Sequence, residues 1–306
     1  MPTETARNVR VRVPAKINLH LGVGPVRADG FHELVTVFHA VDLVDEITAE
    51  PATGLVLRMS GPGSDELPAG PDNLAWRAAS LLAEHVQVPP DVELHVTKAI
   101  PVSGGMAGGS ADAAGVLLAC ATLWQLGSAK SELVELAAEL GSDVPFALTG
   151  GTALGTGRGE FLTPVLSTGQ FSWVLAIASF GLSTADVYRE IDRQRAGEAA
   201  PEPIGSPDAL LDALRSGDPE RVGAELANDL QPAAIALAPQ LRRTLEAGRE
   251  LGALAGIVSG SGPTCAFLCA DADAATQLAA SLAAEGVCRT TRVVNGPVAG
   301  ARHVLP

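Results

Sequence analysis

Residues 101–112 read PVSGGMAGGSAD, a proline-led run with four glycines in six positions ahead of a stretch of alanines and leucines. Glycine loses more backbone entropy on folding than any other residue, so such a cluster destabilises the chain unless the backbone takes positive φ or approaches another group closely. Residues 91–101 alternate apolar and polar side chains like a strand, and residues 110–126 have helical spacing. The order strand, glycine loop, helix therefore predicts a ligand site at the loop.

Phosphate is the ligand that this order favours. Backbone N–H groups at the start of a helix converge on an anion, and the helix dipole adds to the attraction. The run is not a Walker A loop, because Ser110 follows Gly109 without a lysine, and it lacks the GxGxxG spacing of a dinucleotide-binding loop. From the residues alone, a glycine-rich structural turn remains the alternative.

Composition limits the class of protein. The 306 residues carry a formal net charge of −14, with 47% hydrophobic and 18% charged residues. This is the composition of a folded protein, and its acidity argues against a surface for nucleic acid or anionic lipid. The four cysteines form neither a CxxC pair nor a zinc-ligand spacing, and no stretch is apolar over about 18 residues. We expect a cytoplasmic protein with reduced thiols, and neither nucleic acid nor a membrane as partner.

The predicted elements indicate two domains of the α+β class. The length exceeds that at which one hydrophobic core usually stops growing, so we expect domains at 1–165 and 166–306. Residues 9–23 predict an edge strand that kinks at Pro14 and then a second strand, and Asp72/Asn73 predict a helix cap. The remaining predicted elements are strands within 28–50, 54–61, 171–179, 256–269 and 288–294, and helices at 131–140, 208–217, 219–230, 239–252, 273–286 and from 183.

Three stretches together resemble the motifs of the GHMP small-molecule kinases, in the order that this family has them. They are VPAKINLHL at 13–21, PVSGGMAGGSADAA at 101–114 and VSGSGPTCAF at 258–267. The resemblance implies a two-domain α+β fold, with an N-terminal domain like domain 2 of ribosomal protein S5 and a ferredoxin-like C-terminal domain. It also implies an enzyme that transfers a phosphoryl group from ATP, with Mg²⁺, to an alcohol.

The family's catalytic lysine and aspartate correspond to Lys16 in PAKIN and Asp143 in GSDVPF. An aspartate beside an ammonium stays ionised and can accept the proton of the acceptor hydroxyl, while the ammonium offsets charge on the phosphoryl oxygens. Whether Asp143 removes the proton or orients the hydroxyl is open at this point. Taken singly, Lys16 would be interpreted as a solvated strand charge and Asp143 as a helix N-cap.

By the same resemblance, ATP lies along the glycine loop. The residues implied in ATP binding are Asn73 and Lys98, near the purine or ribose, and Pro101, Gly104, Gly105, Met106, Ala107, Gly108, Gly109 and Ser110. Asp112 stands where some relatives have asparagine, and we expect it to cap the helix rather than to touch the nucleotide. We expect phosphate oxygens and water to coordinate Mg²⁺, and we expect no metal-binding residue of the protein. The reason is that the sequence shows no cluster of carboxylates that could surround the ion.

Residues 14–47, 141–160 and 260–264 narrow the resemblance to kinases whose substrate carries a cytidine diphosphate group, on the non-mevalonate route to isoprenoid precursors. The substrate-binding residues that this implies are Asn18, Phe31, His32, Thr184, Tyr188, Gly260, Ser261 and Gly262. Phe31 stands where the family often has a tyrosine, and we expect cytosine to stack between Phe31 and Tyr188, with burial of both rings in the core as the alternative. Residues 155–160, GTGRGE, are interpreted as a structural turn rather than a further phosphate loop.

Two other functions stay open on the sequence. One is another GHMP kinase, of the homoserine or mevalonate type, and the other is a GHMP-fold sensor that binds its ligand without turnover. Small aliphatic alcohols give aromatic rings nothing to stack on, which favours the cytidyl substrate. The presence of both Lys16 and Asp143 argues against the sensor. We expect a monomer or a weak homodimer.

Overall fold

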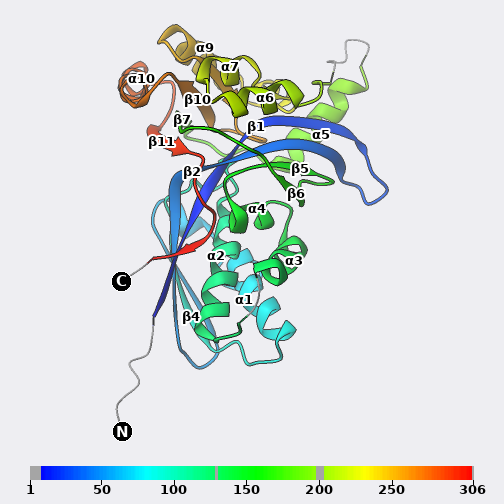
Figure 1. Cartoon of the computed structure of the whole chain (residues 1–306), viewed down its shortest axis with the longest axis vertical. Helices are drawn as coiled ribbons and strands as arrows, with labels where there is room; N and C mark the ends of the chain where they lie inside the picture. Colours follow the sequence, from blue (N-terminus) through cyan, green and yellow to red (C-terminus); the bar gives the residue numbers. More distant parts are fainter. Residues whose placement is uncertain (1–7, 128–129, 198–202, 305–306) are drawn as a thin grey trace.

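The structure is a computed structural model that describes residues 8–127, 130–197 and 203–304. The described residues form two sheets with helices packed on them (Figure 1), which confirms the α+β class. The first, mixed sheet has eight strands: β1 (Val9–Val26), β2 (His32–Glu50), β3 (Leu55–Ser60), β4 (Val92–Thr97), β5 (Thr152–Thr156), β6 (Phe161–Pro164), β8 (Ala227–Asn228) and β12 (Arg302–His303). The second, antiparallel sheet has four: β7 (Phe171–Ile177), β9 (Ala255–Val258), β10 (Cys265–Cys269) and β11 (Thr290–Gly296).

Helices of the described residues fall into two groups along the chain. The first group precedes β5 and consists of a 3₁₀ turn, η1 (Ser64–Glu66), and of α1 (Leu74–His85), α2 (Gly108–Leu123), α3 (Lys130–Leu140) and α4 (Val144–Thr149). The second group follows β7 and consists of α5 (Thr184–Arg195), α6 (Asp208–Ser216), α7 (Pro219–Ala224), α8 (Gln231–Leu237), α9 (Gln240–Glu250) and α10 (Ala272–Glu285).

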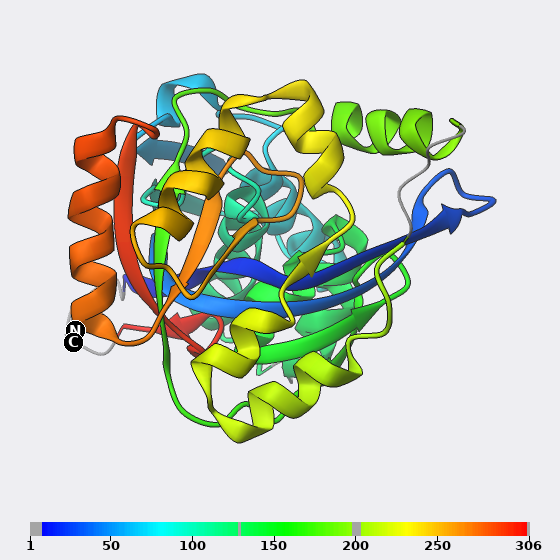
Figure 2. The same cartoon turned by 90° about the horizontal axis from the view of Figure 1, so that it is seen from above.

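The long hairpin of β1 and β2 links the two parts of the molecule. Figures 1 and 2 show these strands side by side from near the N-terminus to the hairpin tip. The predicted break of residues 9–23 into two strands was wrong, because β1 is continuous and has a register shift between Pro14 and Ala15. Proline lacks the N–H for a ladder hydrogen bond, and the irregularity takes up that loss without ending the strand. Nor is β1 an edge strand throughout, since β12 and β8 pair with its other side.

Helix α2 carries the glycine loop onto the first sheet. It contacts β1 and β2 as well as α1, α3 and α4, and most of its small side chains are buried. Asn73 caps α1 as predicted, because its Oδ1 accepts the N–H of Ala75 at 2.8 Å. The predicted cap of α2 by Asp112 was wrong, because α2 begins at Gly108 and Asp112 lies inside the helix.

The second sheet has the ferredoxin-like arrangement. Its strand order is β11-β7-β10-β9, with helices between β7 and β9 and between β10 and β11. Apolar side chains of α5, α8, α9 and α10 pack on one face, and those of α6 and α7 join the larger cluster on the other face. Figure 2 shows α10 alongside β11.

The predicted domain boundary at 165/166 falls in the connection between β6 and β7. After β11 the chain returns to the first sheet, where β12 pairs with β1 and Ala299 bridges Gly150. The division of the chain into 1–165 and 166–306 stays a prediction.

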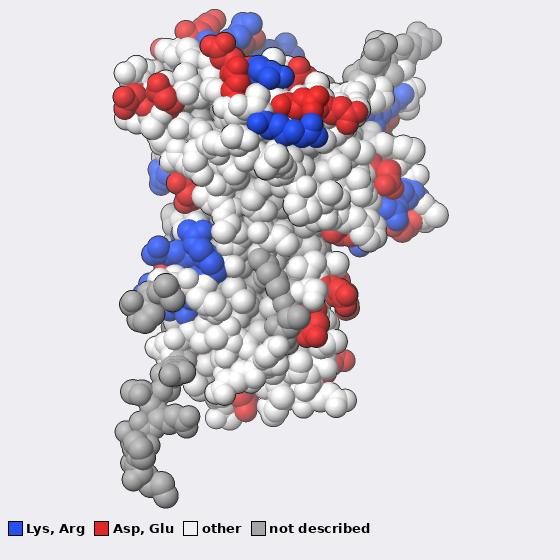
Figure 3. All heavy atoms as spheres, in the orientation of Figure 1, with Lys and Arg blue, Asp and Glu red and all other residues white. Residues whose placement is uncertain are grey.

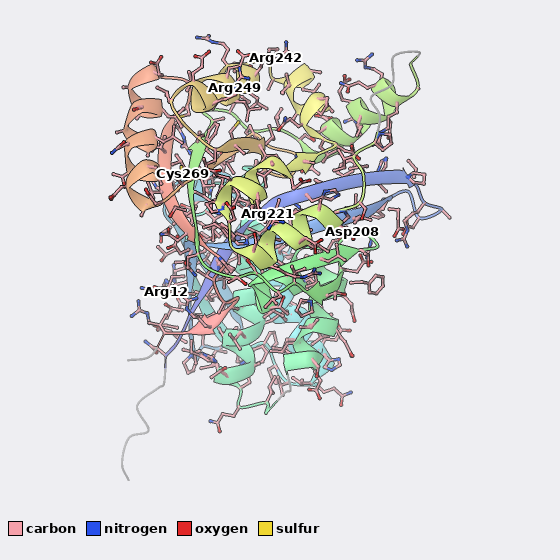
Figure 4. All side chains as sticks on the ribbon, turned by 45° about the horizontal axis from the view of Figure 1, so that its top comes forward. Arg12, Asp208, Arg221, Arg242, Arg249 and Cys269 are labelled. Atoms are coloured by element: carbon pink, nitrogen blue, oxygen red, sulfur yellow. The ribbon has the colours of Figure 1, made fainter. Side chains whose placement is uncertain are left out.

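The surface mixes acidic and basic side chains, which lie next to one another over the upper part of the face in Figure 3. Figure 4 shows side chains of both signs on other helices, with Asp208 on α6, Arg221 on α7 and Arg242 on α9. All four cysteines are free thiols, and Cys269 lies in the second sheet. Among the helices of the described residues, none combines the length and the apolar character that crossing a membrane requires.

Candidate active site

A cleft of about 1020 Å³ lies where the first sheet, the start of α2 and α5 meet. Its walls include a first glycine loop (residues 101–110) and a second glycine loop (residues 259–264). The predicted site residues that line it are Lys16, Asn18, Phe31, His32, Asn73, Lys98, Pro101, Gly104, Gly105, Ala107, Gly108, Gly109, Asp143, Thr184, Tyr188, Gly260 and Ser261. Met106, Ser110 and Gly262 are not among the lining residues. The fold thus brings segments from both halves of the sequence to one site.

The two glycine loops touch each other, and Gly105 makes the contact possible. Its φ is +74°, and a Cβ at this position would lie 2.2 Å from the carbonyl oxygen of Ser259 and 2.8 Å from that of Gly262. Ser259 Oγ donates a hydrogen bond of 3.1 Å to the carbonyl oxygen of Gly105. The second glycine loop therefore fixes the first one at the start of α2.

The start of α2 faces the cleft without a side-chain cap. Ala107 occupies the N-cap position with φ +58°, and no side chain there accepts a hydrogen bond from the first turn. The first N–H groups of a helix have no intrahelical acceptor, so Gly108 and Gly109 present donors to the cleft. This arrangement suits a phosphate group, because donors and helix dipole both favour an anion. Met106 contributes backbone, since its side chain is buried in the core.

Lys16 and Asp143 meet in the cleft, as the sequence predicts. Lys16 Nζ lies 3.6 Å from Asp143 Oδ2, and their side chains are 9% and 31% exposed. The ammonium also donates a hydrogen bond of 2.6 Å to Asn18 Oδ1. Asn18 is held in turn by Thr36, whose Oγ1 accepts from Asn18 Nδ2 at 2.8 Å and donates to the carbonyl oxygen of His20 at 2.7 Å. The β1–β2 pair therefore fixes the position of the lysine.

Asp143 lies at the N-cap position of α4 but does not cap it. Its side chain accepts no hydrogen bond from the first turn of the helix. The alternative interpretation of this residue as a structural cap is therefore wrong. Its carboxylate is free to face the ammonium and a ligand in the cleft.

Aromatic side chains line the end of the cleft formed by the hairpin and α5. The rings of His32 and Tyr188 lie 5.0 Å apart, and His32 Nε2 is 2.9 Å from Asp192 Oδ1. Burial, together with the negative charge of Asp143, raises the pKa of the Tyr188 hydroxyl. Phe31 is 53% exposed, so this ring is not in the core. An open aromatic ring and a half-buried one provide faces on which a planar group can stack.

The sequence did not predict two residues at the aromatic end of the cleft. Asp192 contacts His32 from α5, and Arg158 lies with its guanidinium carbon 5.0 Å from the centre of the Phe31 ring. The turn at 155–160 joins β5 and β6, as predicted, and it carries Arg158 into the cleft. A signal for Asp192 existed in its spacing of one helical turn from Tyr188, but nothing in the sequence paired it with His32.

The second glycine loop lies between α5 and Lys16. Thr184 Oγ1 and Ser261 Oγ are 2.9 Å apart, and a Cβ on Gly260 would lie 3.4 Å from Lys16 Nζ. Gly262 packs away from the cleft, where its Cβ would lie 2.9 Å from a methyl of Val258. The loop therefore closes the cleft beside Lys16 with backbone rather than with bulky side chains.

Lys98 forms ion pairs with two buried carboxylates. Its ammonium contacts Asp45 and lies 2.6 Å from Asp112 Oδ2, in a cluster whose three side chains are at most 3% exposed. Burial alone would lower the pKa of Lys98, but Asp112 and Asp45 together outweigh burial and raise it. A contact of this residue with the nucleotide stays a prediction, as does that of Asn73, whose amide donates to the carbonyl oxygen of Pro68 at 2.8 Å.

Two family models match this chain, and so do curated proteins over nearly its whole length. The family models for the GHMP kinases N terminal domain and the GHMP kinases C terminal match residues 73–151 and 210–288. Similar proteins include the 4-diphosphocytidyl-2-C-methyl-D-erythritol kinase of Mycolicibacterium smegmatis, 61% identical over 99% of this chain and 94% of the relative. That of Mycobacterium tuberculosis is 58% identical over 97% of this chain and 93% of the relative.

Solved structures of GHMP kinases also resemble this chain. A crystal structure of 4-(cytidine 5'-diphospho)-2C-methyl-D-erythritol kinase has a TM-score of 0.76 at 34% identity and covers 93% of this chain and 98% of its own. A homoserine kinase from Cytophaga hutchinsonii has a TM-score of 0.77 at 18% identity over 99% of both chains, which is a likeness of fold alone.

Fold, glycine loops and the paired lysine and aspartate define an ATP-dependent small-molecule kinase of the GHMP class. Within that class, the chain belongs to the family of 4-diphosphocytidyl-2-C-methyl-D-erythritol kinases.

Proposed function

We propose that this chain transfers the γ-phosphoryl group of ATP to a hydroxyl of 4-diphosphocytidyl-2-C-methyl-D-erythritol and forms the 2-phosphate, in the non-mevalonate route to isoprenoid precursors. The observation that carries the proposal is the Lys16–Asp143 pair, 3.6 Å apart, in one cleft with an uncapped helix start and with the aromatic end at Phe31 and Tyr188. Relatives at 58% to 61% identity over nearly the whole chain carry the name of this kinase, which supports the substrate.

The catalytic pair has two roles in the proposal. The Lys16 ammonium offsets the charge that develops on the transferred phosphoryl oxygens, and Asn18 holds it in place with its 2.6 Å hydrogen bond. Asp143 touches the acceptor hydroxyl, which it orients, and is the carboxylate that receives the proton. Burial of the Lys16 side chain strengthens its charge interactions, because little water screens the ammonium.

ATP occupies the first glycine loop in this proposal. The backbone of residues 104–110 and the start of α2 hold its phosphates, and Asn73, Lys98 and Pro101 lie toward the purine and ribose. Mg²⁺ bound with ATP would supply positive charge that offsets the charge on the transferred group. Among the described residues, no three His, Cys, Asp or Glu side chains are grouped so as to hold a metal ion.

Cytosine lies between Phe31 and Tyr188 in the proposal. Phe31 lacks the hydroxyl that a tyrosine would offer, so its part is stacking, and Arg158 packs over its ring. His32 forms hydrogen bonds with the substrate in this proposal, and Asp192 fixes the position of its imidazole ring. Asn18, Thr184, Gly260 and Ser261 surround the rest of the substrate, and Gly262 supports the second glycine loop from the side that faces away from the cleft.

Truncation of Tyr188 tests the stacking. We expect Tyr188→Ala to raise the KM for the cytidyl substrate roughly 5- to 150-fold and the KM for ATP much less, because stacking on a base is worth about 1 to 3 kcal/mol. Tyr188→Phe, the matched control, keeps the ring and should stay close to the parent enzyme. Steady-state kinetics with each substrate varied in turn measures both constants. Equal increases in the two KM values would place the ring in the core instead.

A substrate panel tests the proposed reaction. The purified protein is given ATP, Mg²⁺ and, separately, 4-diphosphocytidyl-2-C-methyl-D-erythritol, homoserine or mevalonate, and ADP release is measured. We expect turnover with the cytidyl alcohol alone. Turnover with homoserine or mevalonate would favour another GHMP kinase, and binding of the cytidyl alcohol without ADP release would favour a sensor.

The proposal also covers the cellular location, the oligomeric state and the partners of the enzyme. Its need for ATP and its four free thiols support a cytoplasmic location. We propose a monomer or a weak homodimer that engages neither nucleic acid nor a membrane, which is in keeping with the net charge of −14.

A further inference from the structure

A buried group of three charges lies beneath the first glycine loop. It consists of Lys98, Asp45 on β2 and Asp112 in α2, each nearly inaccessible to water. Lys98 Nζ contacts both carboxylates and the carbonyl oxygen of Gly108, at 3.3 Å. Lys98 and Asp112 also line the ATP end of the cleft. The group therefore connects the position of the glycine loop with the charge at the nucleotide site.

The two carboxylates have very different surroundings. Asp45 Oδ1 accepts the backbone N–H groups of Ala99 at 2.6 Å and Ile100 at 2.8 Å, and its Oδ2 accepts from Lys98. Asp112 has one donor, Lys98, at its Oδ2, and its Oδ1 has no hydrogen-bond partner among the described residues. The negative charge is therefore much better stabilised on Asp45 than on Asp112.

Charge balance places a proton on Asp112. The charged groups that face it are Lys98, from the connection between β4 and α2, and Asp45, from β2. With both carboxylates ionised, a buried group would carry one uncompensated negative charge, which is costly in a site with little water. Burial raises the pKa of Asp112 to about 8; Lys98 opposes the rise and Asp45 adds to it. Since Oδ2 accepts from Lys98, the proton belongs on Oδ1.

We propose that Asp112 is a further nucleotide-binding residue: in its neutral form, its Oδ1–H donates a hydrogen bond to an oxygen of ATP bound in the cleft. This rests on the proposed function, which places ATP there. A protonated Asp112 offers the same pattern as an asparagine, with one oxygen that accepts from Lys98 and one donor toward the ligand.

Nucleotide binding at two pH values tests the inference. The probe is the non-hydrolysable ATP analogue AMP-PNP with Mg²⁺, titrated calorimetrically into the full chain at pH 7 and pH 9. We expect the Kd of the parent protein to rise roughly tenfold between the two, because the donor is lost and a negative charge appears beside the phosphates. Asp112→Asn should bind as tightly as the parent at pH 7 and change little at pH 9, since every other titrating group is unchanged.

A second variant separates the donor from the charge. Asp112→Ala is neutral and offers no donor, so we expect it to bind AMP-PNP more weakly than Asp112→Asn at both pH values. Identical pH profiles for the parent and Asp112→Asn, or equal affinities of the asparagine and alanine variants, would overturn the inference. Failure of the parent protein to bind AMP-PNP at either pH would instead overturn the proposed function.

Stability of the ligand-free protein gives an independent readout. The folded-state pKa of Asp112 lies above that of an unfolded aspartate, so the parent loses stability as the pH rises from about 4 to about 8. Asparagine has no such loss. We expect the Tm of Asp112→Asn to exceed that of the parent by a margin that grows between pH 5 and pH 8 and then levels off. A constant margin across this range would show that Asp112 does not titrate there.

Discussion

Asp143→Ala should lower the kcat of phosphoryl transfer by roughly 10² to 10⁴, the usual range for the loss of general acid–base help. The carboxylate makes no cap hydrogen bond to α4 and is 31% exposed, so its removal leaves the helix and the fold intact. Lys16 keeps its hydrogen bond to Asn18, and the uncapped start of α2 is unchanged. We therefore expect ATP binding to be largely retained. The measurement is ADP release with saturating ATP and 4-diphosphocytidyl-2-C-methyl-D-erythritol.

Two further variants make this result specific. Asp212→Ala removes an exposed carboxylate on α6 that pairs with Arg215 and lies outside the cleft, so it should leave kcat unchanged. Asp143→Asn keeps the shape of the side chain but cannot accept a proton as a base. If the asparagine variant turns over far faster than the alanine variant, orientation of the hydroxyl is the larger part of the role. Near-normal turnover in Asp143→Ala would remove Asp143 from the catalytic machinery.

The meeting of Lys16 and Asp143 was predictable, because each residue lies in a short motif that resembles one of a known kinase family. The support around it was not. Asn18 reaches Thr36 only because β1 and β2 pair with a register shift between Asn18 and His20. A one-residue change of register turns a side chain to the other face of a sheet, and no sequence pattern fixes where an irregularity falls.

The sequence did not predict the ion pairs between residues that lie far apart along the chain. Lys98 was predicted near the purine or ribose, and the structure places its ammonium between Asp45 and Asp112. Asp45 comes from β2, and its neighbours in sequence give no sign of this contact. Asp112 was interpreted as a cap because aspartate is common there, but packing of α2 on the sheet starts the helix at Gly108 and buries Asp112.

Short helices and strands were not predicted, for a different reason. Helix α8, Gln231–Leu237, and strands β8 and β12, each of two residues, are shorter than the windows in which periodicity can be recognised. Their positions follow from tertiary contacts. The long helix α10, whose periodicity is strong, was predicted at 273–286, close to its observed bounds.

Gly105→Ala should destabilise the protein more than any other single change in the first glycine loop. A non-glycine residue at φ +74° costs about 1 to 3 kcal/mol, and forced overpacking costs about as much again. The new methyl would meet the carbonyl oxygens of Ser259 and Gly262, which are backbone atoms and cannot rotate away. Relief of the clash requires the two loops to separate. We expect a free energy of unfolding lower by at least about 2 kcal/mol, measured by urea denaturation.

Gly109→Ala is the matched control in the same loop, and its expected effect has the opposite sign. Its Cβ would lie 3.6 Å from Leu74 Cδ1, an ordinary contact, and the residue is already helical. Alanine stabilises a helix by about 0.5 to 1 kcal/mol relative to glycine. If separation of the loops also moves the backbone donors, Gly105→Ala should bind AMP-PNP more weakly even below its unfolding temperature. Equal stability of the two variants would show that the contact between the loops does not hold the phosphate site in place.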